Sequence, residues 1–277
     1  MKVGIISKKK NMPEGPECRR VYEGLRTHCI NKKLIKVEIL GGRFLKTPPS
    51  GLETLGLPLE VVGGGVKGKF IWLELETGMS IWITLGMSGF WSIYEKPHSH
   101  IKLVFDDGLE LFFVDQRRFG TLKFATKVEL DAKLKTLGVD ALNDTTASVY
   151  NTIRSFERVP NKTIVEALMN QQLFAGIGNY IKCEMLYRSG ISPHRLVKDL
   201  TDNEIQLLWD YSKLISRASY AQGGASIRNY QQVTGETGDF VFEFEVYGKR
   251  EDPHGNTVIR EKTADGRTTH WVPGLQQ

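Results

Sequence analysis

The spacing of hydrophobic residues changes along this chain, and that change limits the folds available to it. Over residues 34–124 apolar side chains alternate with polar ones, as in Ile71, Leu73 and Leu75, which is the period of strands with one buried face. Over residues 144–219 the spacing becomes three to four, the period of amphipathic helices. A β-rich half followed by a helical half predicts a multidomain α+β protein whose strands form a β-sandwich or a barrel.

Composition narrows the classes of protein further. A chain of 277 residues is long enough for about two domains. Its net charge of +5 is compatible with a nucleic-acid partner. Three cysteines, Cys18, Cys29 and Cys183, exclude a disulfide framework and fit a reducing compartment. With no apolar run of about 20 residues and no signal-peptide core at the start, we expect no membrane contact. An intracellular protein, of the nucleus or of the cytoplasm and nucleoid, is expected rather than a secreted one.

Local signals place individual elements. Pro16 in a first turn, with Glu14 and Glu17 beside the positive end of the helix dipole, predicts a helix from Pro13 to about Ile30. Its apolar face comprises Cys18, Val21, Leu25 and Cys29.

Later signals mark a hairpin, a further helix and the tail. Asp107 and Gly108 form a hairpin turn signal between two apolar runs, and Thr201 with Glu204 forms a capping box that opens a helix. Residues 241–248 and 268–272 have the pattern of strands in a small terminal hairpin.

Five short segments, in this order, resemble the formamidopyrimidine-DNA glycosylase and endonuclease VIII (Fpg/Nei) family. They are Met12–Glu17 (MPEGPE), Lys67–Phe70 (KGKF), Asp115–Gly120 (DQRRFG), Gly176–Tyr180 (GIGNY) and Asp265–Thr269 (DGRTT). The resemblance implies an N-terminal catalytic β-sandwich domain over 13–140 and a helix-two-turn-helix DNA-binding domain over 145–235. It also implies a β-hairpin finger over 240–277, with residues 1–12 as an extension.

The family's activity rests on an N-terminal proline. By resemblance, we expect a bifunctional DNA glycosylase and abasic-site lyase of base excision repair. It would act as a monomer on damaged double-stranded DNA, through a Schiff base at Pro13 and β,δ-elimination. A secondary amine can attack the sugar C1′ and leave a cationic iminium, but only a first residue has that amine. We therefore predict that residues 1–12 are absent from the active protein; the alternative is a proline that merely opens a helix.

The resemblance assigns three more catalytic residues. Glu14 would protonate the deoxyribose ring oxygen, a role suited to a carboxyl whose pKa burial raises, and Glu17 would support it. Lys69 would contact the phosphate beside the lesion, with Lys67 as the rival in a shifted register. Arg267, on the finger, would clamp phosphate and assist δ-elimination.

Three residues match those with which the Fpg branch fills the gap left by an everted nucleotide: Met87, Arg117 and Phe119. For Met87 a place in the core is the alternative. Arg117 counts as DNA-binding as well. The base preference, oxidised purines or oxidised pyrimidines, stays open because motifs of both branches are present.

Two further polar sites have competing interpretations. His98 and His100 would share one face of a strand; we prefer a contact of His98 with the DNA backbone over metal binding. Asn179 follows two glycines at the start of a helix, where it would bind DNA phosphate, act as a plain N-cap, or both.

The finger departs from the family pattern, in which four cysteines hold zinc. Residues 252–256 and 271–275 contain no cysteine, so a closed four-ligand site lacks its donors. We predict a zincless finger held by apolar packing of residues such as Val258, Trp271 and Val272, and an enzyme without metal or cofactor.

Two other functions compete with this one. The first is a non-catalytic DNA-binding member of the same fold. The second is a member whose lyase activity is blocked by the N-terminal extension.

Overall fold

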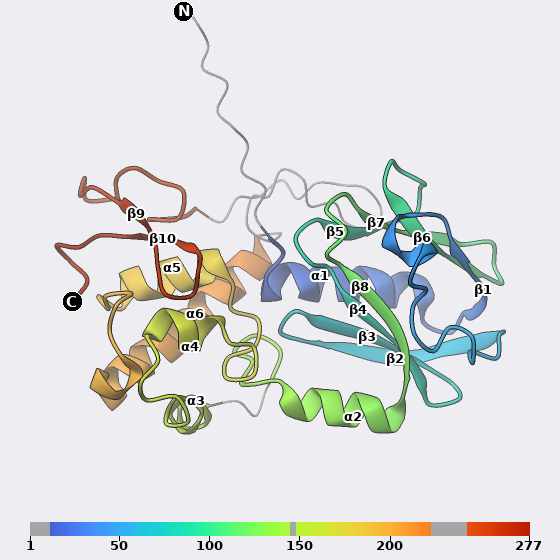
Figure 1. Cartoon of the computed structure of the whole chain (residues 1–277), viewed down its shortest axis with the longest axis horizontal. Coiled ribbons are helices and arrows are strands. Elements are labelled where there is room, and N and C mark those ends of the chain that lie inside the picture. The colour runs from blue at the N-terminus through green and yellow to red at the C-terminus, as the bar shows by residue number, and fades with distance from the viewer. Residues whose placement is uncertain (1–11, 145–147, 223–242) are drawn as a thin grey trace, which may run out of the picture.

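The computed structural model describes residues 12–144, 148–222 and 243–277. Figure 1 shows a β-rich half and a helical half side by side, with helix α1 (Gly15–Cys29) running between them and the terminal hairpin above the helices. The predicted α+β multidomain class is confirmed. The predicted first helix is also confirmed, to within two residues at its start.

Eight antiparallel strands form one sheet in the order β5-β7-β6-β1-β2-β3-β4-β8. They are β1 (Lys33–Ile39), β2 (Leu59–Lys67), β3 (Phe70–Leu75), β4 (Met79–Thr84), β5 (Gly89–Ser92), β6 (Ser99–Phe105), β7 (Glu110–Asp115) and β8 (Thr121–Thr126). Strands β1 and β2 pair at only two positions. The sheet therefore divides there into two four-stranded parts, as a sandwich requires. The turn at Asp107 and Gly108 joins β6 to β7, as predicted.

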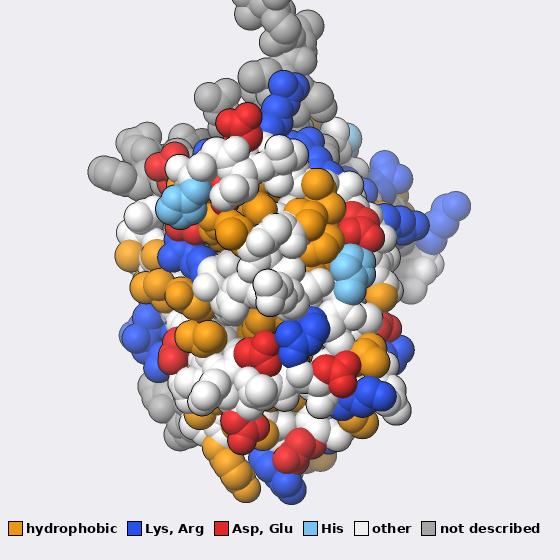
Figure 2. All heavy atoms as spheres, turned by 90° about the vertical axis from the view of Figure 1, so that its left-hand side faces the viewer, with side chains coloured by type: hydrophobic (Ala, Val, Ile, Leu, Met, Phe, Trp, Pro, Cys, Tyr) orange, Lys and Arg blue, Asp and Glu red, His pale blue; other side chains and the backbone are white. Residues whose placement is uncertain are grey.

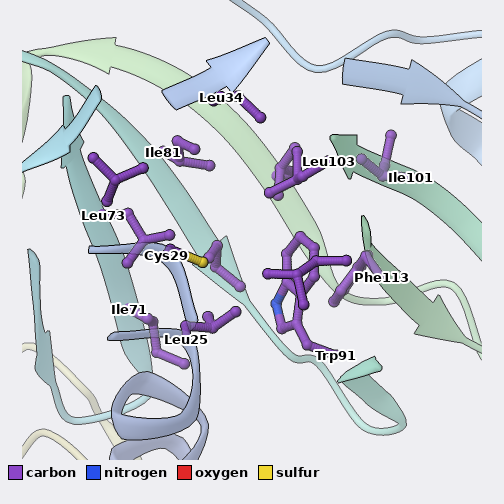
Figure 3. Close-up of a cluster of buried hydrophobic side chains, with 14 of the residues drawn as sticks. Leu25, Cys29, Leu34, Ile71, Leu73, Ile81, Trp91, Ile101, Leu103 and Phe113 are labelled. Atoms are coloured by element: carbon purple, nitrogen blue, oxygen red, sulfur yellow. The ribbon is translucent and has the colours of Figure 1, made fainter. Parts of the chain in front are cut away.

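The core of this half lies between the two parts of the sheet and α1. Figure 3 shows Leu25 and Cys29 of α1 among side chains from both parts, including Leu73 of β3 and Trp91 of β5. Trp91 is fully buried, and its ring centroid lies 5.3 Å from that of Phe113. Burial of this apolar face helps to hold α1, and with it Pro13 and Glu14, in a fixed position.

The helical half contains α3 (Val149–Phe156), α4 (Ile164–Met169), α5 (Asn179–Arg188) and α6 (Asp202–Ala221). A short 3-10 helix at Val197–Asp199 precedes α6, and another at Gly42–Leu45 lies between β1 and β2 in the β-rich half. The capping box predicted for α6 is present: the Glu204 carboxylate accepts from the Thr201 N–H at 2.7 Å. Helix α6 also contacts α1, since the Tyr220 hydroxyl donates to the Glu23 carboxylate at 2.7 Å.

Helix α2 (Lys127–Thr136) was not predicted. It has no apolar stripe, because Leu130 is its single buried residue and Val128 is 79 % exposed. Its formation rests on a capping box of Thr126 and Glu129 and on the exposed ion pair of Lys127 with Asp131. These are local interactions that leave no periodic signal in the sequence.

The terminal hairpin differs from the predicted one. Residues 241–242 lie outside the described residues, and 243–248 form no strand because the Glu184 carboxylate accepts their N–H groups at positions 245–247, at 2.8–3.1 Å. The hairpin consists of β9 (Ile259–Lys262) and β10 (Thr268–Trp271). The strand predicted near 268–272 is therefore confirmed, whereas the one predicted over 241–248 was wrong in its described part, residues 243–248.

Across the described part of the chain, no helix has both the length and the apolar character needed to cross a membrane.

Candidate active site

Three glycines from distant segments meet where the two halves join. The Gly15 N–H donates to the Gly176 carbonyl at 2.9 Å. A Cβ on Gly68 would lie 2.6 Å from the Gly176 nitrogen. That contact is too short for any side chain, so the position requires glycine. Gly68 and Gly176 also have φ of +58° and +92°, which favour glycine. We call this contact the glycine junction; it brings the start of α1, the β2–β3 turn and the turn before α5 together.

The Glu14 carboxylate is buried at the N-terminus of α5. One of its oxygens accepts from the Tyr180 N–H at 2.8 Å, and the other accepts from the Gly178 N–H at 2.9 Å and the Ile181 N–H at 3.2 Å. These are backbone groups that a helix leaves unpaired at its first turn. A Cβ on Gly178 would lie 2.1 Å from Glu14 Cδ, so this cradle requires glycine there.

Burial raises the pKa of Glu14 to about 7. The Lys69 ammonium opposes that rise, Glu17 adds to it, and the backbone donors of α5 lower it. Burial also lowers the pKa of Lys69, while Glu14 holds it up. A carboxyl with a pKa near 7 can both give and take a proton at physiological pH, as general acid–base chemistry requires.

Glu17 supports Glu14 from behind. Its carboxylate accepts from the Glu14 N–H at 2.8 Å and from the Tyr180 hydroxyl at 3.2 Å. The Tyr180 hydroxyl also lies 3.0 Å from Ser219 Oγ of α6. The start of α1 is thus fixed to both α5 and α6 through buried side chains.

A cavity of about 320 Å³ lies at the start of α1, next to the buried Glu14, which does not itself line it. Pro13, Lys69 and Arg267 all line it, although they come from the start of α1, the β2–β3 turn and the β9–β10 turn. Lys67 does not line it. That residue faces a separate cavity of about 430 Å³ together with Lys135 and other basic residues.

Met87, Arg117 and Phe119 lie on two neighbouring loops, after β4 and after β7, and we call them the gap-filling residues. Phe119 is 55 % exposed, and the Arg117 guanidinium carbon lies 5.3 Å from its ring centroid. Met87 is half-buried in its turn, not in the core. An exposed aromatic ring beside an arginine can enter an opened base stack.

Two buried carboxylates that the sequence analysis did not single out hold loops of the site: Asp115 the gap-filling loops, and Asp140 the β2–β3 turn. Asp115 accepts from the Ser88 hydroxyl and, at 2.7 Å, from the Gly120 N–H, which joins the two gap-filling loops. Asp140 accepts from the N–H of Gly68 and thereby fixes the turn that carries Lys69. The signal for Asp115 was available, since it opens the DQRRFG segment; nothing local marked Asp140.

Two predicted placements need correction. His98 has a φ of +71° and precedes β6, so it does not share a strand face with His100, whose buried ring donates to the Asp115 carbonyl at 2.9 Å. Asn179 is the first residue of α5, and Gly178 is the N-cap. The plain N-cap interpretation of Asn179 was therefore wrong; its amide donates to the Thr268 carbonyl of β10 at 2.9 Å.

The finger residues do not fit a zinc site. In the first turn the Asp252 carboxylate accepts from the backbone N–H of Asn256 at 2.8 Å and from the Tyr187 hydroxyl at 2.9 Å. In the second turn the Gln276 side chain accepts from the Val272 N–H at 2.7 Å. The three cysteines of the chain lie elsewhere, in α1 and α5. Among the described residues no three histidine, cysteine or acidic side chains come together as metal ligands.

Of the three residues predicted to hold the finger by apolar packing, Val258 and Val272 do so and Trp271 does so only in part. Val258 and Val272 are buried against Cys183 and Val246. Trp271 is only half-buried; its ring contacts His194, and its indole N–H donates to Glu261 at 3.1 Å.

Three family models match successive parts of this chain. They are the formamidopyrimidine-DNA glycosylase N-terminal domain over residues 12–122, the H2TH domain over 137–231 and the C-terminal domain over 236–277. The chain belongs to the formamidopyrimidine-DNA glycosylase family. The predicted resemblance is therefore confirmed, and membership makes DNA glycosylase the class of activity.

Individual relatives agree with this assignment. Formamidopyrimidine-DNA glycosylase of Cronobacter sakazakii is 32 % identical, with 96 % of this chain and 100 % of that protein covered. The crystal structure of MutM (Fpg) from Thermus thermophilus is 28 % identical with a TM-score of 0.83, covering 95 % of this chain and 98 % of that one. Lactococcus lactis Fpg, solved with DNA containing an oxidized pyrimidine, is 25 % identical with a TM-score of 0.82, covering 96 % and 100 %.

The face of the molecule that carries the helices and the hairpin is not uniformly basic. Figure 2 shows acidic and basic side chains interspersed over it, with hydrophobic ones between them. On this face a contact to an anionic backbone would therefore depend on cations at particular positions rather than on a broad positive field.

Proposed function

We propose that this protein is a bifunctional DNA glycosylase and abasic-site lyase of base excision repair, acting inside the cell on damaged double-stranded DNA. The observation that carries the proposal is the cavity in which Pro13, Lys69 and Arg267 meet beside a Glu14 carboxyl with a pKa near 7. A nucleophile, an acid–base group and two phosphate-binding cations in one place are what this chemistry needs.

Pro13 is the proposed nucleophile. The lone pair of its free ring nitrogen attacks the deoxyribose C1′, the bond from C1′ to the damaged base breaks, and the base leaves with the bonding electrons. The proton that the Pro13 nitrogen then loses balances the one that the departing base takes up. Glu14 protonates the ring oxygen as the sugar opens, which leaves an iminium between Pro13 and C1′. The iminium then withdraws electrons while the C2′ proton is lost and the C3′–O bond breaks.

Lys69 and Arg267 act on the phosphates. Lys69 holds the phosphate beside the lesion and assists strand cleavage, and Arg267 assists δ-elimination, in which the C4′ proton is lost and the C5′–O bond breaks. A guanidinium suits this place because it can donate two parallel hydrogen bonds to one phosphate. His98 and Asn179 are proposed to contact the DNA backbone, and the gap-filling residues to replace the everted nucleotide.

The proposed nucleophile requires Pro13 to be the first residue. The match to the N-terminal family model begins at residue 12, which supports a working chain that starts at Pro13 after removal of Met12. A free α-amino group titrates near pH ~8, so a neutral fraction exists at physiological pH. In the longer chain the Pro13 nitrogen is an amide and has no such lone pair.

Borohydride trapping tests the proposal. The full chain and a chain beginning at Pro13 are each incubated with duplex DNA containing an abasic site, while borohydride is present to reduce any iminium. The chain beginning at Pro13 should form a covalent adduct, and the full chain should form less than about a hundredth as much. A matched Pro13→Ala chain keeps a primary amine at its start and controls for the ring.

The outcomes separate the competing functions. DNA binding without an adduct from the shorter chain would favour a non-catalytic DNA-binding protein. Equal trapping by both lengths would show that the nucleophile is not the Pro13 amine. Base excision is then measured on duplexes that carry either a purine or a pyrimidine lesion. Both are needed because Lactococcus lactis Fpg has been solved with DNA containing an oxidized pyrimidine and with DNA containing N7-benzyl-Fapy-dG.

A further inference from the structure

One ion pair in the described residues is almost completely buried. Lys182 Nζ lies 2.6 Å from Asp265 Oδ2, and the two side chains are 0 % and 2 % exposed. Every other ion pair described has a partner that is at least 23 % exposed. Because two buried charges cost much of what their attraction returns, such a pair is poorly explained by stability and better explained by the orientation that it imposes.

The pair joins the helix that holds Glu14 to the turn that carries Arg267. Lys182 lies in the first turn of α5, directly after the Tyr180 and Ile181 N–H groups that bind the Glu14 carboxylate. Asp265 lies in the β9–β10 turn, two residues before Arg267.

Asp265 also organises its own turn. Its second oxygen accepts from the Thr263 hydroxyl at 2.6 Å and from the Arg267 N–H at 3.4 Å. Gly266, with a φ of +74°, closes the turn through a bond from its N–H to the Thr263 carbonyl at 2.8 Å. The carboxylate therefore binds the backbone of Arg267 on one side and the buried Lys182 on the other.

A second contact anchors the far side of the same turn. The Asn179 amide donates to the Thr268 carbonyl, one residue after Arg267. Arg267 is thus held between two attachments, both of which originate in the first turn of α5. The Arg267 side chain lines the cavity that contains Pro13.

We propose that the Lys182–Asp265 pair is a positioning device that directs Arg267 into the catalytic cavity and fixes it relative to Glu14. The inference rests on the proposed function of Arg267. Neither member of the pair lines the cavity, so both are positioning residues rather than catalytic ones.

The test removes both charges at once, in Lys182→Met combined with Asp265→Asn. Removing one partner would leave an uncompensated buried charge, whereas removing both is often neutral for stability. Single-turnover cleavage of abasic-site DNA is followed with separate measurement of β- and δ-elimination products. The δ-elimination rate should fall about tenfold to a hundredfold, the range expected for a displacement of about 1 Å, whereas borohydride trapping at Pro13 should change less than about threefold.

Two comparisons make the result specific. Arg267→Ala should show the same selective loss, and adding it to the double variant should cause little further loss, because both changes remove the same interaction. The matched control replaces an exposed pair, Lys127→Met with Asp131→Asn on α2. It should leave the rates of β- and δ-elimination unchanged.

Failure of this proposal can be distinguished from failure of the proposed function. If the chain that begins at Pro13 traps DNA and the folded double variant of that chain keeps its δ-elimination rate, the positioning proposal is wrong and the lyase assignment stands. If no form of the chain traps DNA, the lyase assignment itself fails. Should the double variant not fold, Asp265→Glu decides the question: it keeps the charge, moves the carboxylate by one methylene, and should reduce δ-elimination alone.

Discussion

Glu14 and Arg267 lie in or beside one cavity but are positioned by opposite means. The Glu14 carboxylate is bound by three backbone N–H groups at the start of α5, and glycine is required for it to fit. Arg267 is oriented by side chains, through the Lys182–Asp265 pair and the Asn179 amide. The backbone cradle can be altered only by changing the glycine or the helix, whereas the finger can be altered one side chain at a time.

The two sites therefore differ in how strictly the chemistry determines their surroundings. A carboxyl with a pKa near 7 needs burial and a fixed hydrogen-bond environment, which a helix terminus provides independently of side-chain identity. A phosphate clamp needs only a correctly aimed guanidinium, and different side-chain networks can aim it. The finger turns, organised here by Asp252 and Gln276, are an instance of that freedom.

The largest effect should come from Gly178→Ala. The added Cβ would lie 2.1 Å from Glu14 Cδ and must displace the carboxylate from its three donors. We expect excision of an oxidised base to fall by more than about a hundredfold, measured under single-turnover conditions. Gly274→Ala is the control, because a Cβ there meets nothing within 4 Å; equal losses in both variants would contradict the cradle.

An intermediate and pH-dependent effect is expected for Glu14→Gln. The acid form of Glu14 disappears as pH rises through about 7, whereas the neutral form of an N-terminal amine grows as pH approaches ~8. Excision by the chain that begins at Pro13 should therefore pass through a maximum between these values. Glu14→Gln should lower the rate about a hundredfold and abolish the decline on the alkaline side. If the rate of the variant still declines on the alkaline side, that decline belongs to a titrating group other than Glu14.

The smallest effect should come from metal removal. Because side-chain hydrogen bonds occupy the finger turns, we expect a chelator to change neither the melting temperature nor the cleavage rate. Metal analysis of the purified chain should find zinc well below one atom per chain. One zinc per chain, with loss of the δ-elimination activity on chelation, would show that the finger is metal-dependent after all.

The sequence predicted those elements whose signals are local. The apolar face of α1, the turn at Asp107 and Gly108, and the capping box of Thr201 with Glu204 each lie within a few residues, and all three are present. The family was recognised from five short segments, because each retains residues whose chemistry depends on type and spacing.

Interactions between distant segments could not be predicted in the same way. Glu14 and Gly178 are 164 positions apart, and no pattern near either indicates that they meet. The segment at 243–248 alternates like a strand, yet Glu184 on α5 takes its N–H groups. Local pattern describes what a segment can form; the partner that satisfies its backbone decides what it does form.

The glycine junction has a consequence for how this molecule can move. Since Gly15, Gly68 and Gly176 touch through main-chain atoms, with only the Ala175 methyl beside Gly68, the two halves have little at that point that could repack to accommodate sliding. Any hinge opening that admits a duplex must leave this point in place and bend elsewhere. Under the proposed mechanism the reacting groups are then assembled before DNA arrives, and the energy of binding is left for deforming the duplex.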